Sequence, residues 1–272
     1  MSIPVLGAEA AQGLVRAVAA NAGIAVSGRF GPAATVLAEY LAGGAGDLLV
    51  LTHAQVAQLA ARARVDLASC ADLGAAAGTA TVLTVALRPG PVPPAARELA
   101  RHLAGRDGAP ARLAAGFHGA AIRRADGRDT AAARELVFAI LGEYGLVPEP
   151  EATDADLMDL ERGFLAGGGM FDVAIGEDGR LEACCGLKVL ADGRLELRKM
   201  YVRRDARGQG LGQRLLDRAI AWARGSGFAR VELETASILK EAIALYRKAG
   251  FSPRPGKPDT RRCDQAFVLE LD

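Results

Sequence analysis

The sequence predicts a two-domain α/β protein, and its length and the order of its apolar segments indicate this fold class. A chain of 272 residues exceeds the usual size of a single domain. In the first part, short apolar runs at 3–6, 24–27 and 47–51 alternate with alanine-rich stretches that suit helices. Such alternation favours a parallel or mixed sheet that is covered by helices.

The remaining elements of the first part continue this alternation. Helices are expected at 8–21, 33–42, 54–63 and 95–103. A longer strand is expected at 79–87, followed by the proline-rich segment 89–94. The second of its two adjacent prolines can open the next helix, because a proline at the first helical position lacks only an N–H that has no helical partner.

A second series of elements begins near residue 120. A short strand at 120–126 precedes an amphipathic helix at 130–144, for which Asp129 or Thr130 can supply the N-cap. We place the domain boundary between the two series, near residues 117–119. The predicted domains are residues 1–118 and 119–272.

The second series continues with a helix and a meander. A helix is expected to start at 153–156 and to stop at the glycines of 167–169. The dipeptides Asp178-Gly179 and Asp192-Gly193 then favour tight turns between strands. Antiparallel strands are therefore expected on both sides of each turn.

Composition and charge exclude several classes of protein. The net charge is +1, so the total gives no indication of a nucleic-acid partner or an acidic membrane surface. The start of the chain has no basic segment followed by an apolar one, and no apolar run approaches the roughly 20 residues that span a bilayer. The four cysteines lack metal-ligand spacing, and we expect them to be reduced and to pack as small hydrophobic residues. We therefore expect a cytoplasmic protein without a metal.

The most informative segment is a strand at 195–202, a glycine-rich loop at 207–212 and a helix. Its helix places Leu211, Leu215 and Ala219 on one side, with Trp222 on the same stripe. A helix N-terminus has backbone N–H groups without helical partners, and glycines let an anion approach them. This order of elements suits a pyrophosphate. The alternative is a tight turn whose glycines only allow close packing, and the GxGxxG dinucleotide pattern is not matched.

A second segment consists of a strand at 232–235 and a helix at 238–249. The helix carries Ala242, Leu245, Tyr246 and Ala249 on one face, and Gly250 follows it as a natural helix stop.

Together the two segments resemble the GNAT N-acetyltransferase superfamily. RDARGQGLGQRLL resembles its pyrophosphate motif, and AIALYRKAGF resembles its tyrosine-containing helix. The resemblance extends over about residues 120–272. It implies a mixed central sheet flanked by helices, in which two parallel strands splay apart and acetyl-CoA lies between them.

The resemblance also implies functional residues. Ten residues are expected to bind the cofactor: Met200, Tyr201, Val202, Arg207, Gly208, Gln209, Gly210, Leu211, Gly212 and Gln213. Tyr246 matches the position whose phenol protonates the departing thiolate, although a plain core tyrosine is the alternative. Glu196 and Glu234 are candidate bases, or else strand residues in salt bridges with nearby arginines. One departure is Leu239, which stands where many relatives carry an asparagine.

The implied function is that of a transferase, more specifically an acetyl-CoA-dependent N-acyltransferase. It would move an acetyl group to the primary amine of a small acceptor by direct attack, with acetyl-CoA as co-substrate. Neither nucleic acid nor membrane is an expected partner, and homodimer formation is left open. One alternative is a sensory or regulatory module that binds acetyl-CoA and uses the first domain for a ligand or an interaction.

Residues 1–118 bear a weaker resemblance to one lobe of the molybdate-type, or type II, periplasmic solute-binding proteins. It is carried by SGRFGPAATVLAEYLAGGAGDLLVLTHAQVAQLA and by a return segment at 82–104. Only about 20 residues separate these parts, so the second lobe of that family is missing. Because Glu9 follows the first strand and would repel an anion, we expect a scaffold, an oligomerisation surface or a regulatory module rather than an oxyanion-binding domain.

Overall fold

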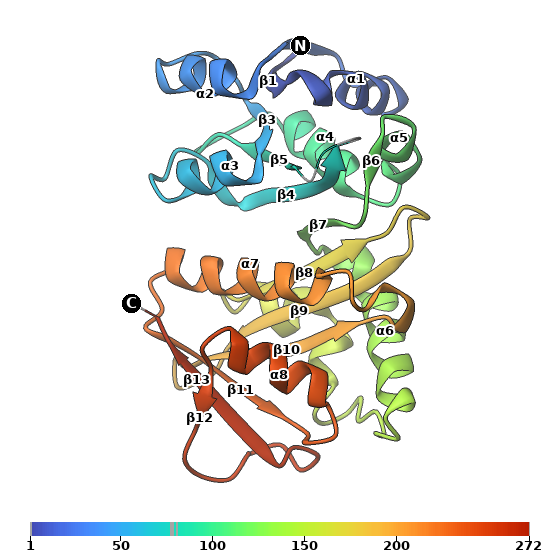
Figure 1. Ribbon diagram of the computed structural model, residues 1–272, viewed down its shortest axis with the longest axis vertical. Coiled ribbons are helices and arrows are strands. Elements are labelled where there is room, and N and C mark those ends of the chain that lie inside the picture. Colours follow the sequence, from blue (N-terminus) through green and yellow to red (C-terminus); the bar gives the residue numbers. More distant parts are fainter. Residues whose placement is uncertain (1, 77–78, 80, 272) are drawn as a thin grey trace. The chain divides into compact units, whose positions relative to one another are not determined.

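The computed structural model describes residues 2–76, 79 and 81–271, and the chain forms two compact units (Figure 1). The first unit comprises Met1–Arg124 together with Ala174–Arg180, and the second comprises Ala125–Val173 and Leu181–Asp272. The domain boundary expected between residues 118 and 119 stays a prediction. It lies shortly before the end of the first unit's main segment.

The first unit is a mixed sheet with helices on both faces. Its elements are β1 (Ile3–Ala8), the 3-10 helix η1 (Glu9–Ala11), α1 (Gln12–Asn21), β2 (Val26–Gly31), α2 (Ala33–Leu41), β3 (Leu48–Thr52), α3 (His53–Ala60), β4 (Asp66–Ala76), β5 (Val82–Leu87), α4 (Pro94–Ala104), α5 (Ala109–Ala114), β6 (Phe117–His118) and β7 (Ala121–Arg124). The strand order is β7-β4-β5-β3-β1-β2, and β6 pairs with β4. Strand β1 is parallel to β2 and β3, whereas β5 is antiparallel to β3 and β4.

The period-two pattern of β3 shows why both faces need helices. Leu48 and Val50 belong to a core that includes residues of α1 and α4, whereas Leu49 and Leu51 belong to one that includes residues of α2 and α3. Successive side chains of a strand point to opposite faces, so a continuous apolar strand is stable only when both faces are covered. The resemblance of this unit to a solute-binding lobe stays a prediction.

Strand β4 of the first unit was not predicted from the sequence. Its sequence, DLASCADLGAA, contains neither a β-branched nor an aromatic residue, so its local preference for a strand is weak. It is a strand because it pairs with β5, β6 and β7. The strand expected at 79–87 is observed as β5, starting at Val82, and part of the expected range lies outside the described residues.

The second unit is the predicted mixed sheet flanked by helices. Its elements are the 3-10 helix η2 (Gly127–Asp129), α6 (Thr130–Glu143), the 3-10 helix η3 (Ala155–Leu157), the π-helix η4 (Glu161–Leu165), β8 (Met170–Ile175, up to Val173), β9 (Leu181–Val189), β10 (Leu195–Val202), the 3-10 helix η5 (Arg204–Ala206), α7 (Leu211–Gly225), β11 (Arg230–Thr235), α8 (Lys240–Lys248), β12 (Ser252–Pro253) and β13 (Gln265–Glu270). The strand order is β12-β13-β11-β10-β9-β8. Strands β10 and β11 are parallel, whereas the pairs β9–β10 and β11–β13 are antiparallel.

Helices cover both faces of this sheet around β9. Cys184 and Cys185 are adjacent on the strand, so their side chains point to opposite faces, and both are fully buried. Helices α6 and α7 both contact β9, and Figure 1 shows α7 and α8 in front of the strands. The expected packing of these cysteines as small hydrophobic residues is confirmed.

One local prediction for the second unit was wrong, and another was confirmed in part. The helix expected from 153–156 to the glycines of 167–169 is instead the short η3 followed by the π-helix η4. Gly163 lies so close to the preceding turn that an added Cβ would be 2.3 Å from the Asp156 carbonyl oxygen, which marks an irregular chain path. Asp129, one of the two residues expected at the N-cap of α6, is its N-cap, but its side chain makes no capping hydrogen bond to that helix. It instead forms a capping box with Asp126 at η2, one turn earlier.

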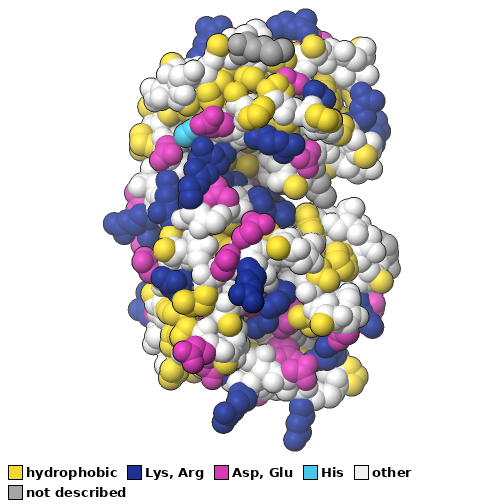
Figure 2. Space-filling model, turned by 180° about the vertical axis from the view of Figure 1, so that it is seen from behind, with side chains coloured by type: hydrophobic (Ala, Val, Ile, Leu, Met, Phe, Trp, Pro, Cys, Tyr) yellow, Lys and Arg dark blue, Asp and Glu magenta, His cyan; other side chains and the backbone are white. Residues whose placement is uncertain are grey.

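The charge distribution on the surface and the lengths of the helices can be compared with the expectation of no nucleic-acid or membrane partner. On the face shown in Figure 2, basic and acidic side chains are interspersed rather than separated into broad areas of one sign. Within the described residues, no helix is long and apolar enough to cross a membrane. In the same part of the chain, no three His, Cys, Asp or Glu side chains are grouped to hold a metal ion. The cytoplasmic location stays a prediction.

Candidate active site

A cavity of about 430 Å³ lies in the second unit, where β10 and β11 separate. Its lining comes from these two strands, from α6, from the loop before α7 and the start of α7, and from α8. The parallel register of β10 and β11, both fully described strands, contains two pairs, Glu196 with Glu232 and Leu197 with Leu233. Because β10 continues to Val202 and β11 to Thr235, the strands splay beyond these pairs. Beyond Leu197, the backbone of β10 is therefore not paired with β11 and can offer groups to a ligand.

A β-bulge shapes β10 at the point where the strands separate. The register with β9 shifts between Arg198 and Tyr201, so one residue more lies on β10 than on its partner. Lys199 has a φ of 54°, which is uncommon for a residue with a side chain. The bulge changes the direction in which the following backbone groups point, and Met200 and Tyr201 line the cavity.

The N-terminus of α7 forms the other end of the cavity. Gly208 and Gly210 have φ values of 78° and 76°, a conformation that side chains disfavour. Gly210 is the N-cap and makes no side-chain capping hydrogen bond, so the first N–H groups of α7 are left without a cap. With the positive end of the helix dipole, these groups suit an anion such as a pyrophosphate.

The structure brings the predicted cofactor-binding residues together. All of them except Gln209 line the cavity: Met200, Tyr201, Val202, Arg207, Gly208, Gly210, Leu211, Gly212 and Gln213. The side chain of Gln209 is exposed and donates to the Asp205 carbonyl oxygen at 3.3 Å. An added Cβ on Gly212 would lie 3.3 Å from a methyl carbon of Leu245, so a side chain there would narrow the cavity.

Arg207 connects the loop to α6 rather than pointing freely into the cavity. Its Nη2 donates to Glu143 at 2.7 Å, and its Nε donates to the Val202 carbonyl oxygen at 2.9 Å. The guanidinium also lies over the ring of Tyr144, 5.7 Å from its centre. These contacts hold the glycine loop between β10 and the end of α6, so Arg207 contributes to the shape of the cradle.

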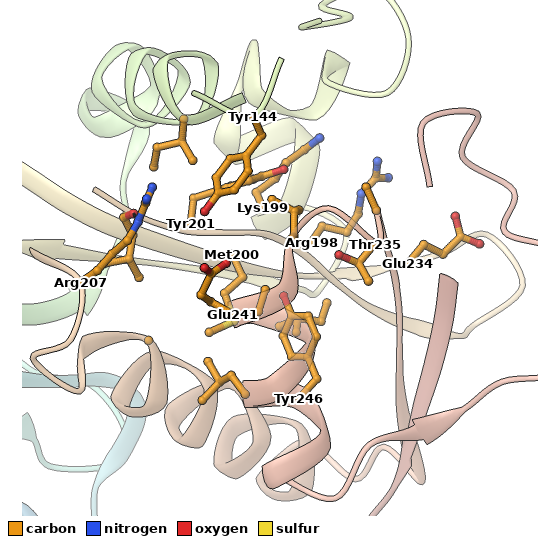
Figure 3. Close-up of a pocket in the computed structure, with 18 of the residues that line it drawn as sticks. Tyr144, Arg198, Lys199, Met200, Tyr201, Arg207, Glu234, Thr235, Glu241 and Tyr246 are labelled. Carbon is orange, nitrogen blue, oxygen red and sulfur yellow. Dashed lines mark hydrogen bonds between the residues drawn. The ribbon is translucent and has the colours of Figure 1, made fainter. Parts of the chain in front are cut away.

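Tyr246 lies on α8 with its side chain directed into the cavity (Figure 3). The residue is 6% exposed, and its ring packs 5.8 Å from that of Phe251. Burial raises the pKa of its phenol well above the usual range. The phenol therefore stays protonated at neutral pH and can donate a proton.

Glu196 lines the same cavity from β10 and keeps one loosely held partner. Its Oε2 lies 3.7 Å from Nη1 of Arg198, too far for a hydrogen bond. Burial raises the pKa of the Glu196 carboxyl, and the opposing effect of Arg198 does not cancel this. A half-buried carboxylate with a raised pKa is suited to accept a proton.

Glu234 also lines the cavity but is held by a loop. Its Oε1 accepts from Nη2 of Arg254 at 3.0 Å and from the amide of Asp259 at 2.7 Å. Its Oε2 accepts from the amide of Thr260 at 2.9 Å. Burial alone raises the pKa of Glu234, but these hydrogen bonds outweigh it, and the net pKa is lowered. Figure 3 shows its carboxylate directed away from Tyr246. This geometry favours Glu196 over Glu234 as the base.

A buried ion pair that was not predicted from the sequence lies beside the cavity. Lys199 donates from Nζ to Asp154 at 2.5 Å and to the Thr153 carbonyl oxygen at 2.8 Å. Arg262 binds the two oxygens of Asp154 at 2.6 and 2.8 Å. Asp154 is fully buried, and Lys199 is 6% exposed. No local pattern predicts this set, because its members come from three distant segments.

Comparisons with known proteins are consistent with this geometry. Residues 135–251 match the model of the acetyltransferase (GNAT) family. The chain is 35% identical over 135 residues to the uncharacterized N-acetyltransferase YjgM of Escherichia coli strain K12, which covers 48% of this chain and 80% of that protein. It is 44% identical over 59 residues to an IAA acetyltransferase of Azospirillum brasilense, which covers 22% of this chain and 39% of that relative.

Solved structures show the same fold for the second half of the chain. An acetyltransferase of the GNAT family from Staphylococcus aureus has a TM-score of 0.51 at 22% identity and covers 56% of this chain and 98% of that one. The splayed strands and the uncapped helix of the cavity occur within the residues that match the family model. This chain therefore belongs to the GNAT family and is an acetyltransferase.

Proposed function

We propose that this protein transfers an acetyl group from acetyl-CoA to the primary amine of a small acceptor by direct attack. The observation that supports this most is one cavity in which four features meet. They are the uncapped N-terminus of α7, the free edge of β10, the buried phenol of Tyr246 and the half-buried carboxylate of Glu196.

The described residues fit acetyl-CoA. The N–H groups at the start of α7 suit its pyrophosphate, and the open edge of β10 offers backbone groups to its pantetheine arm. Leu239, at the N-cap of α8, also lines the cavity and makes no side-chain capping hydrogen bond, so this edge offers an apolar contact instead of an amide. Acetyl-CoA supplies the acetyl group as a thioester, whose carbonyl carbon is open to attack by an amine.

The acceptor amine is protonated at neutral pH and must lose a proton before it can attack. Glu196 accepts this proton, directly or through water, and leaves the nitrogen neutral. The nitrogen then forms a bond to the acetyl carbon, and the backbone N–H groups of β10 beyond the bulge stabilise the negative charge on the carbonyl oxygen.

The reaction ends when the bond between the acetyl carbon and the sulfur breaks. Tyr246 donates its phenolic proton to the departing sulfur, so that a thiol leaves instead of a thiolate. The new amide nitrogen gives up its second proton, which restores the phenol directly or through water. The proton taken by Glu196 passes to solvent, and the cycle is balanced.

A thermal-shift comparison tests the donor first. Acetyl-CoA at about a hundredfold excess over its Kd should raise the Tm by about 5 °C, because a ligand that binds only the folded state stabilises it by mass action. Molybdate and sulfate should leave the Tm unchanged. Release of CoA thiol with a panel of amines then tests the reaction. A shift with an oxyanion but none with acetyl-CoA would contradict the proposal.

A further inference from the structure

A second cavity of about 480 Å³ continues from the first on the side away from the start of α7. The two cavities share residues of β10, β11 and the neighbouring loops: Thr153, Glu196, Arg198, Glu234 and Thr260. None of the residues of the glycine loop or of α7 lines the second cavity. If the donor occupies the first cavity as proposed above, the acceptor reaches the thioester through the second.

The lining of the second cavity is strongly polar. Its charged residues are four arginines and five carboxylates: Arg194, Arg198, Arg254, Arg261, Glu149, Glu196, Glu232, Glu234 and Asp259. The apolar lining residues are Ala152, Leu190 and Leu233, and none of the lining residues is aromatic. This cavity offers little apolar surface to an aromatic or long aliphatic amine.

Four of these nine charged side chains pair with one another. Glu232 pairs with Arg194 at 3.1 Å and with Arg254 at 3.6 Å. Glu234 pairs with Arg254 at 3.0 Å and accepts two backbone hydrogen bonds. Because these four side chains pair with one another, we assign them to the wall of the cavity rather than to its binding groups.

Glu196 and Arg198 differ from these four residues because they combine two properties. They line both cavities, and each keeps polar atoms that can still form hydrogen bonds with a ligand. They are two residues apart on β10, so both side chains point to the same face. Arg198 donates from Nη2 to the Thr153 carbonyl oxygen at 3.0 Å, and its Nε lies 3.3 Å from Asp156. Its Nη1 remains, 3.7 Å from Oε2 of Glu196, so the two opposite charges face each other without a hydrogen bond.

We propose that the acceptor is a small zwitterion, an amine with a carboxylate close to the amino group, as in an amino acid. Its amino nitrogen lies at Glu196, and its carboxylate accepts a hydrogen bond from Nη1 of Arg198. A polyamine would place a second cation against Arg198, and an acid without an amine would meet Glu196. The inference rests on the proposed acetyl transfer and specifies its acceptor.

Matched acceptors test this on the unaltered protein. The panel consists of the standard L-amino acids, their carboxamides, and three amines without a carboxylate, namely ethanolamine, spermidine and tyramine. For at least one amino acid, kcat/KM should exceed that of its carboxamide and of the three amines by about tenfold or more, the loss expected for one charge-assisted hydrogen bond. Carboxamides or spermidine reacting as well as the amino acids would overturn the zwitterion and leave acetyl transfer intact. If no amine reacts although acetyl-CoA binds, acetyl transfer to amines fails as well.

Arg198 is then tested by substitution. In Arg198→Gln, kcat/KM for the preferred amino acid should fall about thirtyfold, while that for its carboxamide should fall less than about threefold, because only the carboxylate loses a charged partner. Equal losses for both substrates would show that Arg198 only maintains the structure. Arg230→Gln is the matched control: this arginine lies on β11, is 53% exposed and lines neither cavity. If the glutamine variant does not fold, Arg198→Lys keeps the charge while changing its geometry and should lose the same preference in part.

Discussion

At the scale of single residues, Tyr246 is the side chain whose role is most sharply testable. Tyr246→Phe keeps the ring and its packing on Phe251 but removes the proton donor. We expect kcat to fall about a hundredfold, within the usual range for one general acid, with the Kd for acetyl-CoA changed less than about threefold. Initial rates of CoA release and calorimetric binding measure the two quantities. An unchanged kcat would remove the phenol from the mechanism.

Glu196 should be visible in the dependence of kcat/KM on pH. A base works only when deprotonated, and burial raises the pKa of this carboxyl. Activity should therefore fall on the acid side at a pH above the usual glutamate pKa of about 4.3. The variant Glu196→Gln should lose most of its activity and this acid limb together.

The control for this prediction is Glu234→Gln, at the carboxylate whose pKa is lowered by its hydrogen bonds. It should keep the acid limb and instead lose stability, because the amides of Asp259 and Thr260 lose a charged acceptor. An acid limb that follows Glu234 rather than Glu196 would exchange the two roles.

At the scale of elements, the junction of the glycine loop and α7 depends on a backbone conformation. Gly210 has a φ of 76°, and an added Cβ would meet nothing within 4 Å, so the obstacle to a side chain is conformational. A β-branched residue is strongly disfavoured in this conformation. Gly210→Val should turn the first N–H groups of α7 away and weaken acetyl-CoA binding by about tenfold or more, as measured by calorimetry.

Gly142, inside α6, is the matched control because an added Cβ there also meets nothing within 4 Å. Gly142→Ala should leave acetyl-CoA affinity unchanged and raise the free energy of unfolding by about 0.5–1 kcal/mol, since alanine favours the helix. Equal loss of affinity in the two variants would show that the cradle does not depend on the conformation at Gly210.

The buried ion pair connects three segments of the second unit that are distant in the sequence. Hydrogen bonds from Arg262, from the Glu149 amide and from Lys199 hold the pKa of Asp154 well below its usual range, although burial alone raises it. Asp154→Asn should therefore lower the free energy of unfolding by about 3 kcal/mol at pH 7, as expected when one partner of a buried pair is removed. Urea unfolding measures this difference.

The sign of the pH dependence follows from the lowered pKa of Asp154. Its contribution is complete above the unfolded-state pKa of about 3.9 and declines as the pH falls below it. The difference in the free energy of unfolding between the wild type and Asp154→Asn should thus shrink as the pH is lowered below about 4. Asp178→Asn, in an exposed turn where the side chain accepts from the Arg180 amide, should change stability by less than about 0.5 kcal/mol. A difference that grows on acidification would contradict the assignment.

At the scale of the whole molecule, ligand binding should slow hydrogen exchange in the second unit and leave the first unit unchanged. The residues that line the cavity all belong to the second unit. On adding acetyl-CoA to the full chain, hydrogen exchange should slow at the start of α7 and along β10, because backbone that binds a ligand unfolds locally less often. Strands β1 to β5 should exchange as before. Protection of those strands would show that the first unit takes part in donor binding.

The order of elements in the second unit could be read from local physics. Apolar periodicity, glycine stops and turn dipeptides act within a few residues, so β10, α7, β11 and α8 were predicted close to their observed positions. Two of the missed segments lack such signals. Strand β4 has weak local preference and forms through pairing, and the segment at 153–167 is shaped by the buried Asp154.

The sequence by itself determined the order of strand, glycine loop and helix in the second unit, and its resemblance to the acetyltransferase family predicted part of the cavity lining. Only the tertiary structure distinguished the two glutamates. The carboxylate of Glu196 can still accept hydrogen bonds from a ligand, whereas the oxygens of Glu234 are bound by a distant loop. The tertiary structure also paired Lys199 with Asp154, 45 residues away. The physical reason is that a side chain's charge state and hydrogen bonds depend on neighbours in space, which no local pattern encodes.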